Sequence, residues 1–177
     1  VDLRAAQRLR YLVFARELGA AGDSVNHEAQ LEWDQFDRHC DHLVLEDVRR
    51  SKDDLDHVVG VYRLLQSKQA MQAGGFYSEA EFDLNPLTTR NLKLLELGRS
   101  CLHPDYRGGA AMFHMWSGLT QFSAEHDIDV LFGVASFHGT SPQDLRDELS
   151  FLHHRHLAPE PLRVRSKQHQ NMDLVDE

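Results

Sequence analysis

One stretch constrains the fold more than any other: residues 94–137 read as strand, glycine turn, apolar helix and second strand. The run LLELGRSCL is mostly apolar, although it carries a Glu and an Arg three residues apart, and this predicts a strand buried in a sheet. Gly108 and Gly109 then lead into a helix at 110–125 with apolar residues at helical spacing. The segment 129–137 reads as another buried strand. This order predicts a β–α–β crossover, which is right-handed in nearly all proteins.

The elements around this crossover predict an α/β (α+β) fold, with a mixed, largely antiparallel sheet flanked by helices. A last helix is expected to begin with Ser141 as cap and Pro142 at its first position. At 177 residues the chain is expected to form one domain, 1–177, with a C-terminal end that is truncated or disordered. The other predicted elements are a helix at 2–18, a loop at 20–41, antiparallel strands at 42–47 and 57–66, an unpatterned segment at 67–85 and a short helix at 86–92.

Charge and composition exclude some classes of function. The formal net charge of −9 argues against general nucleic-acid binding, which needs surplus Lys and Arg. No apolar run approaches the roughly 20 residues that span a bilayer, and the two cysteines form neither a disulfide framework nor a metal motif. We therefore expect a reduced, cytoplasmic protein. A basic cluster of Arg155, Arg163 and Arg165 is a candidate contact for an acidic partner.

The crossover itself carries candidate chemistry. In the turn Arg107-Gly108-Gly109-Ala110, backbone N–H groups and the helix dipole favour an anion. The turn lacks the Lys of a Walker loop and the glycine spacing of a dinucleotide site. Glu96 lies in the apolar strand, where burial suits a carboxyl group to proton transfer. Because Arg99 is an odd number of positions away, a direct pair between the two requires a bulge or twist.

A second group of candidate charges lies upstream of the crossover. Glu32, Asp34 and Asp37 alternate with aromatic residues, which predicts that this part of the loop packs onto the protein. Arg63 stands in an apolar strand, where a charge needs a partner, and one of the loop acids is the natural candidate. Arg10 is expected to act as a similar clamp from the first helix. A structural salt bridge and an active-site scaffold both satisfy this pattern.

The strand, basic glycine turn and helix resemble the pyrophosphate-binding turn of N-acyltransferases of the GNAT superfamily. Four motifs, in order along the chain, resemble those of the acyl-homoserine-lactone (autoinducer) synthases, which are GNAT-like and use acyl carrier protein: RYLVF, EWDQFD, GVYRLL and ELGR. The fuller runs LELGRSC, MWSGL and LFGVASFHG are more similar to a sister family, the ornithine lipid N-acyltransferases, often labelled hemolysin-like. The resemblance covers roughly residues 10–165. It implies a single GNAT-like acyltransferase domain. It also implies transfer of a (3-hydroxy)fatty acyl group to the α-amine of ornithine, in ornithine lipid biosynthesis.

The resemblance further implies roles for residues and partners. The donor would be an acyl-phosphopantetheine thioester on acyl carrier protein rather than on coenzyme A, with no permanently bound cofactor and no metal. The catalytic base of a direct transfer would be Glu96 or Glu32, and the lipid product implies peripheral contact with the inner membrane. Expected substrate-binding residues are Arg10, Phe14, Asp34, Asp37, Arg63, Arg99 and Ser100. Expected pantetheine-binding residues are Leu97, Cys101, Arg107, Gly108, Gly109 and Ala110.

Other interpretations stay open. An autoinducer synthase would use S-adenosylmethionine as acceptor, and a non-catalytic GNAT-like module would bind acyl groups without turnover. Ser100 and Cys101 suggest a covalent acyl-enzyme, but no His stands at a telling offset, so direct transfer is preferred. The histidines at 153–156 read as a surface cluster rather than a metal site. Trp116 and the Met-rich face of its helix read as core, with an acyl tunnel as the alternative.

Overall fold

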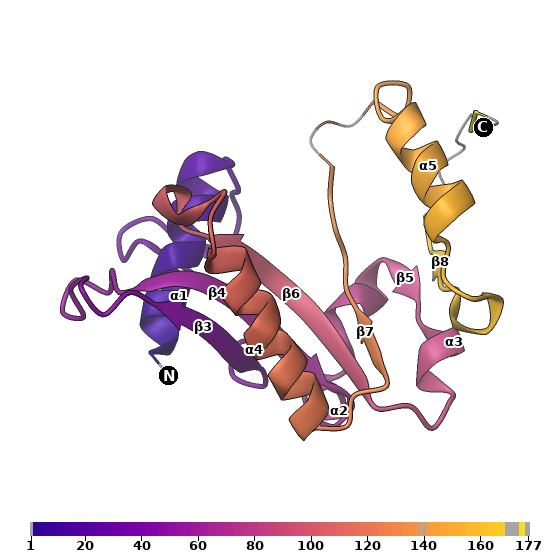
Figure 1. The fold of residues 1–177 in the computed structure, drawn as a ribbon, viewed down its shortest axis with the longest axis horizontal. Coiled ribbons are helices and arrows are strands. Elements are labelled where there is room, and N and C mark those ends of the chain that lie inside the picture. The colour runs from indigo at the N-terminus through magenta and orange to yellow at the C-terminus, as the bar shows by residue number, and fades with distance from the viewer. Residues whose placement is uncertain (1, 138, 140, 169–173, 176–177) are drawn as a thin grey trace. The chain divides into compact units, whose positions relative to one another are not determined.

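The computed structural model, drawn in Figure 1, describes residues 2–137, 139, 141–168 and 174–175. Contacts divide the chain into two compact units, which we describe separately. The sheet unit comprises Val1–Phe76 and Lys93–Phe132, and the C-terminal unit comprises Tyr77–Leu92 and Gly133–Glu177. The single domain over 1–177 stays a prediction. The C-terminal end is expected to be truncated or disordered, and part of it lies outside the described residues.

The elements follow the predicted order, with additions. The helices are α1 (Leu3–Arg10), α2 (Ser67–Ala73), α3 (Asn85–Thr88), α4 (Ala111–Glu125) and α5 (Arg146–His156), with a π-helix η1 (Tyr11–Glu17) continuing α1 and 3₁₀ turns η2 (Tyr77–Ala80), η3 (Pro104–Tyr106) and η4 (Glu160–Leu162). The strands are β1 (Val25–Asn26), β2 (Leu31–Glu32), β3 (Asp41–Glu46), β4 (Val58–Gln66), β5 (Phe82–Asp83), β6 (Leu94–Leu102), β7 (Val130–Phe132) and β8 (Arg165–Ser166).

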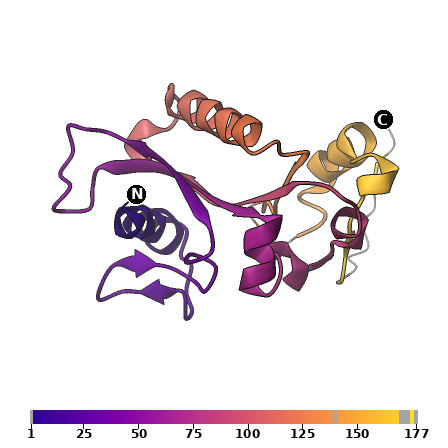
Figure 2. The ribbon, with the colours of Figure 1, turned by 90° about the horizontal axis from the view of Figure 1, so that it is seen from below.

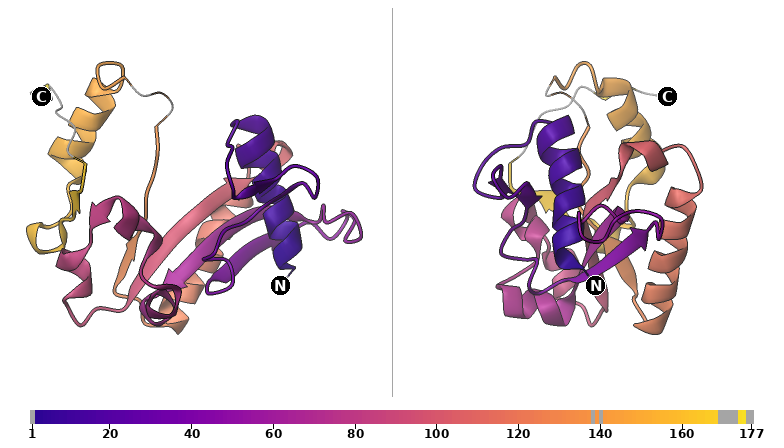
Figure 3. Two further views of the ribbon diagram at one scale, coloured as in Figure 1. Left: turned by 180° about the vertical axis from the view of Figure 1, so that it is seen from behind. Right: turned by 90° about the vertical axis from the view of Figure 1, so that its left-hand side faces the viewer.

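The sheet unit is built on the strand order β3-β4-β6-β7. Strands β3, β4 and β6 are antiparallel neighbours, and β7 pairs with β6 in parallel after the α4 crossover. Figures 2 and 3 show α1 on one face of this sheet and α4 on the other. The predicted α/β (α+β) class, with a largely antiparallel sheet flanked by helices, is confirmed.

Each face of the sheet has its own apolar cluster. Toward α1, the helix residues Ala5, Ala6 and Leu9 pack with Val61 of β4 and Cys101 of β6. Toward α4, the cluster is Leu64, Leu95 and Leu119. Burial of each Leu and Val side chain in these clusters contributes about 1.5–3 kcal/mol. It therefore holds both helices against the sheet.

A bulge in β6 reverses which face its side chains point to. Val61 lies opposite Cys101, whereas Arg63 lies opposite Gly98, so β6 has one residue more than β4 in this interval. Arg99 takes up the extra residue with φ of 49°, in the left-handed region that few non-glycine residues adopt. Leu95 therefore faces α4, although Cys101, six positions on, faces α1. A direct pair between Glu96 and Arg99 is expected to require a bulge or twist, and β6 contains such a bulge.

Three secondary-structure predictions need correction. The loop predicted at 20–41 contains a hairpin, in which Val25 pairs with Glu32. The unpatterned segment 67–85 contains α2, whose N-terminus is closed by a capping box between Gln66 and Gln69. The last helix starts at Arg146 instead of Pro142, because Ser141 accepts the N–H of Asp144 and so caps a preceding turn.

The strand predicted at 129–137 is much shorter than expected. β7 is paired with β6 only from Leu94 to Glu96 and ends at Phe132, and Leu131 is 41% exposed rather than buried. As an edge strand, β7 has one partner, and apolar composition alone does not extend its pairing. The β6 edge from Leu97 onward lies beyond this ladder.

Helix α4 buries a narrower stripe than its composition suggests. Ala111, Met115 and Leu119, four positions apart, are buried against the sheet. Trp116 is 48% exposed and Phe113 is 73% exposed, because both lie off that stripe. The interpretation of Trp116 as core is wrong for the sheet unit.

The close packing of α4 on β4 gives a prediction at Gly60. A Cβ there would lie 2.8 Å from Leu102 Cδ2, 3.0 Å from Met115 Sδ and 3.2 Å from Leu45 Cβ. We expect Gly60→Ala to lower the free energy of unfolding by about 1–3 kcal/mol, as overpacking does. Gly98→Ala is the matched control, since its Cβ would meet only Arg63 Nε at 3.9 Å. Equal urea midpoints for the two variants would contradict the packing described here.

Candidate active site

A buried ionic network joins helix α1, the β1–β2 hairpin and the loop after it. Arg10 is fully buried. Its Nε donates to Glu32 Oε2 at 2.6 Å, and its Nη1 and Nη2 donate to the two oxygens of Asp37 at 2.9 Å each. Nη2 also donates to the backbone oxygen of Glu32 at 2.8 Å. Such forked, charge-assisted bonds fix the loop against the helix.

Strand β4 adds a second guanidinium to the network. Arg63 Nη1 donates to Asp34 Oδ1 at 2.6 Å and to Asp37 Oδ1 at 2.9 Å. Its guanidinium also lies 5.7 Å from the ring centroid of Phe36, a cation–π arrangement. The expectation that Arg63 pairs with a loop acid is confirmed.

The β6 bulge brings in the third guanidinium. Arg99 Nε donates to Glu32 Oε1 at 3.0 Å, and Nη2 lies 3.3 Å from Asp34 Oδ2. Both oxygens of Glu32 therefore accept from guanidinium groups, one from α1 and one from β6. A regular strand could not present Arg99 together with Glu96, so the strained residue at φ 49° serves this contact.

The network is balanced in charge and graded in exposure. Three Arg side chains face three carboxylates, so each buried charge is compensated. The side chains of Arg10, Arg63, Glu32 and Asp37 are at most 5% exposed, whereas Asp34 is 16% and Arg99 is 23% exposed. The inner part is a scaffold, and Asp34 with Arg99 forms its solvent-facing edge.

Glu96 lies on the same face of β6 as this network. It is 4% exposed and is the cross-strand partner of Leu65. Because Leu95 and Leu97 pack with the α4 cluster, strand alternation turns Glu96 toward α1. A buried carboxyl group therefore lies on the side of the sheet that also carries the ionic network.

The electrostatics of the network shift two pKa values downward. Burial would raise the pKa of Asp37, but hydrogen bonds from Arg10, Gln7 and Arg63 outweigh it and leave the pKa below the ordinary 3.8. Burial lowers the pKa of His42 below 6.5, only partly offset by its bond to the backbone oxygen of Asp37 at 3.1 Å. Because a carbonyl only accepts, Nε2 of His42 carries the proton.

This leads to a pH prediction. Since the pKa of His42 is lower in the folded protein, the unfolded chain binds more protons below about pH 6.5, and stability falls as the pH drops through that range. Asp37 acts in the same direction, below pH 3.8. We expect His42→Gln to flatten the fall in unfolding free energy between about pH 7.5 and pH 5. Urea titrations compare the two proteins; identical pH slopes would contradict this assignment.

The glycine turn is fixed from two sides. Tyr106 donates to Asp47 Oδ2 at 2.6 Å, and Arg107 donates to both carboxylate oxygens of Glu17 at 2.5 Å and 2.7 Å. Gly108 adopts φ of 74°, and no atom lies within 4 Å of a Cβ placed on Gly108 or Gly109. No side chain caps the N-terminus of α4 at Ala110. The turn therefore leaves open space where side chains would stand at both glycines.

The remaining predicted site residues lie apart from the network contacts. Leu97 packs with the α4 cluster, Phe14 packs against the α1 cluster, and Ser100 is exposed in the bulge. Cys101 is buried, and burial raises the pKa of its thiol to about 12. Burial likewise raises the pKa of Cys40 to about 12. Thiols held protonated in this way are poor nucleophiles.

Sequence reasoning missed several residues around the site. Gln7 donates to Asp37 Oδ2 at 2.9 Å, one helical turn from Arg10. His42, opposite Arg63 across β3 and β4, and Glu17, at the end of η1, were not singled out. The spacing of Gln7 and Arg10 on one helix face could have indicated that both contact the same acidic loop. No local sequence feature identified His42 or Glu17 as part of the site. Among the described residues, no group of three or more His, Cys, Asp or Glu side chains could hold a metal ion.

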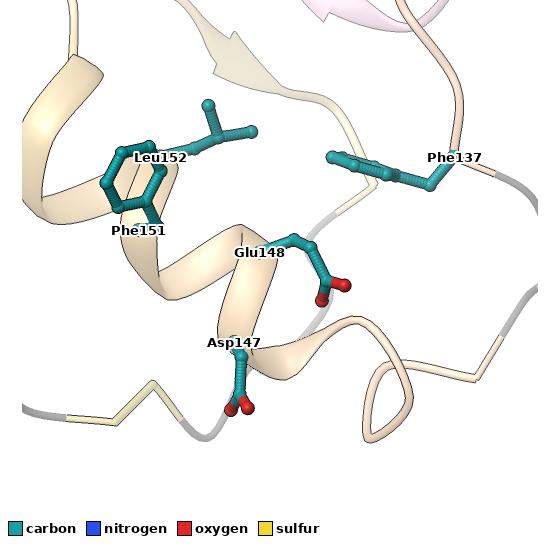
Figure 4. A pocket seen from close by; sticks show the side chains of 5 residues that line it. All are labelled: Phe137, Asp147, Glu148, Phe151 and Leu152. Carbon is teal, nitrogen blue, oxygen red and sulfur yellow. The ribbon is translucent and has the colours of Figure 1, made fainter.

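The C-terminal unit holds a separate open pocket of about 420 Å³. Figure 4 shows Leu152 of α5 extending toward Phe137, with Phe151 beside it and the carboxylates of Asp147 and Glu148 on the first turn of the helix. The surface of this pocket is mainly apolar. None of the predicted site residues contributes to it.

Comparison with known proteins gives the class first. Residues 9–117 match the family described as acetyltransferase (GNAT) domain. The fold is shared with the acyl-homoserine lactone synthase LasI (TM-score 0.53, 19% identity, 76% of this chain and 64% of that chain). It is also shared with the CoA-dependent acyl-homoserine lactone synthase BjaI, solved with SAM and isopentyl-CoA (TM-score 0.51, 21% identity, 74% and 57%). Fold and family match together define a GNAT acyltransferase.

Sequence relatives then narrow the family. The chain is 56% identical over 174 residues to L-ornithine N(alpha)-acyltransferase of Rhodobacter capsulatus, covering 98% of this chain and 67% of the relative. The enzyme of the same name from Brucella abortus is 42% identical over 177 residues, covering 98% and 63%. The chain belongs to this L-ornithine N(alpha)-acyltransferase family, as the motifs predicted. It spans about two thirds of the length of these relatives. Among the described residues no helix is long and apolar enough to cross a membrane.

Proposed function

We propose that this chain transfers a (3-hydroxy)fatty acyl group from acyl carrier protein directly to the α-amine of ornithine. The relatives' names support ornithine as acceptor. The observation that carries the proposal is the buried network of three Arg and three carboxylates on the side of the sheet that also carries the buried Glu96.

The exposed edge of the network suits a cationic amino acid. Arg99 offers a guanidinium to the acceptor's carboxylate, and Asp34 offers a carboxylate to its side-chain ammonium. The deeper residues Arg10, Asp37 and Arg63 hold that edge in place. Phe14 and Ser100 complete the proposed acceptor site.

Glu96 is the base in this proposal, with Glu32 in support. The α-amine must lose a proton as nitrogen attacks the thioester carbon, and a buried carboxylate can accept it. Both oxygens of Glu32 already accept guanidinium N–H groups, so this carboxylate is better suited to hold Arg99 than to take a proton. The proton moves to Glu96, the acyl carbon bonds to nitrogen, and the pantetheine thiolate leaves.

The donor would bind along β6 and the turn that follows it. The β6 edge at Leu97 to Cys101 lies beyond the β7 ladder and can accept the pantetheine amides, while Arg107, Gly108, Gly109 and Ala110 would hold its phosphate. Contact of Cys101 with the donor would use its backbone, since its side chain is in the core. No resident cofactor or metal is part of the proposal. Peripheral contact with the cytoplasmic side of the inner membrane would deliver the lipid product.

The decisive experiment measures free thiol release from 3-hydroxyacyl carrier protein with ornithine, with S-adenosylmethionine or with neither, followed by mass spectrometry. Ornithine-dependent release and an N-acyl product are expected. A lactone from S-adenosylmethionine would identify an autoinducer synthase instead. Binding without release would identify an acyl-binding module.

A variant with three reversed charges tests the proposed contact with the carrier protein. Arg155, Arg163 and Arg165 lie in the C-terminal unit as exposed residues. Replacing all three by Glu is expected to raise the KM for carrier-bound acyl groups about tenfold while leaving kcat nearly unchanged, because rim charges act on encounter. An unchanged KM would remove these residues from the carrier contact.

A further inference from the structure

Glu17 forms an ion pair with Arg107, the residue whose guanidinium would bind the phosphate of the donor. Its two carboxylate oxygens accept from Arg107 Nη1 and Nη2 at 2.5 Å and 2.7 Å. The two residues are 90 positions apart in the chain, so the fold alone brings them together. This fork-to-fork geometry is the strongest form of an Arg–carboxylate pair.

The rest of the Arg107 guanidinium is also engaged. Nε and Nη2 both lie within hydrogen-bond distance of the Leu102 backbone oxygen, at 3.3 Å and 3.2 Å. All three nitrogens therefore have a partner within the protein. A phosphate at the turn must either displace Glu17 or share the guanidinium with it. Displacement is feasible, because Arg107 is 42% and Glu17 is 37% exposed.

A carboxylate at this position penalises highly charged donors more than weakly charged ones. The phosphopantetheine of a carrier protein is attached through a phosphodiester with about one negative charge, whereas a coenzyme A thioester carries roughly three to four on its pyrophosphate and 3′-phosphate. Repulsion from Glu17 grows with that charge. The guanidinium that would offset it is already neutralised.

We propose that Glu17 is a specificity-determining residue that selects carrier-bound thioesters over coenzyme A thioesters. This rests on the proposed function, since it concerns the donor of that reaction. If the Glu17–Arg107 pair only links η1 to the turn, a different result is expected. Loss of the pair then lowers stability and changes kcat/KM equally for both donors.

The test compares kcat/KM for 3-hydroxyacyl carrier protein and for the same acyl group on coenzyme A, with ornithine as acceptor. We expect Glu17→Gln to raise the coenzyme A value about fivefold or more, to change the carrier value less than twofold, and to lose this difference in high salt. Glu28→Gln, which removes an exposed carboxylate from the β1–β2 hairpin, is the control for net charge and should leave the ratio unchanged. Equal changes for both donors would overturn the proposal.

A second measurement does not depend on turnover. Calorimetric titration with free coenzyme A is expected to give about fivefold tighter binding to Glu17→Gln than to the unaltered chain, and weaker binding to Arg107→Gln, which leaves the carboxylate without its partner. Unaltered affinity in Glu17→Gln would reject the role of Glu17. Absence of acyl transfer from either donor, with the affinity change present, would reject the proposed function and retain the role of Glu17 at the anion site.

Discussion

Replacing Arg10 by Met is expected to lower the free energy of unfolding by about 3–5 kcal/mol, the loss typical of removing one partner from a buried ion pair. Met keeps much of the volume of the side chain. It leaves Glu32 and Asp37 buried without the guanidinium that donates to both at 2.6–2.9 Å. The cost arises chiefly from those two carboxylates, which remain charged in a place with little solvent.

Urea unfolding measures this effect, with Arg4→Met as the matched control. Arg4 lies on the same helix and is exposed, so its replacement should change stability by no more than about 0.5 kcal/mol. A double-mutant cycle sharpens the test. Asp37→Asn should cost less in the Arg10→Met background than in the unaltered chain, because in that background Asp37 is a buried charge that has lost the Arg10 guanidinium, and Asn removes that charge. A loss below about 1 kcal/mol for Arg10→Met would show that the network contributes little to folding.

Glu96→Gln is expected to lower kcat of the proposed acyl transfer by about 100-fold or more, the usual contribution of a general base. Gln is nearly isosteric and can still accept a hydrogen bond, so folding should be retained. Because the change removes only proton acceptance in the transition state, KM for ornithine should stay within a few-fold of its original value. Measuring both kcat and KM for ornithine therefore distinguishes a catalytic role of Glu96 from a role in binding.

Glu46→Gln supplies the comparison for Glu96. Glu46 also lies on a strand of the sheet, at the exposed end of β3, and should retain full turnover. Thermal unfolding of both variants checks that the sheet is intact. Less than a threefold loss of kcat in a folded Glu96→Gln protein would move the base elsewhere, and Glu32→Gln would then be the next variant to measure.

The local elements could be predicted because their causes are local. Helices α1 and α4 have apolar residues at helical spacing, whereas strands β4 and β6 are short, largely apolar runs of strand length. The crossover followed from their order. The local sequence pattern did not predict the features that depend on strand pairing or on helix packing against the sheet. The edge strand β7 ended at Phe132 although the apolar run continues, and Trp116 is exposed although its helix is apolar on most sides.

The candidate site divides in the same way. The sequence by itself determined which charges stand in apolar surroundings, because Arg63 and Glu96 in strands require compensation wherever they lie. Only the tertiary structure decided which partners meet. Arg10 reaches Glu32 and Asp37 across 22 and 27 positions, and Arg99 reaches Glu32 across 67. The bulge at Arg99 and the pairing of Glu17 with Arg107 depend on strand register and helix docking, which arise from contacts distant in sequence and leave no periodic trace in it.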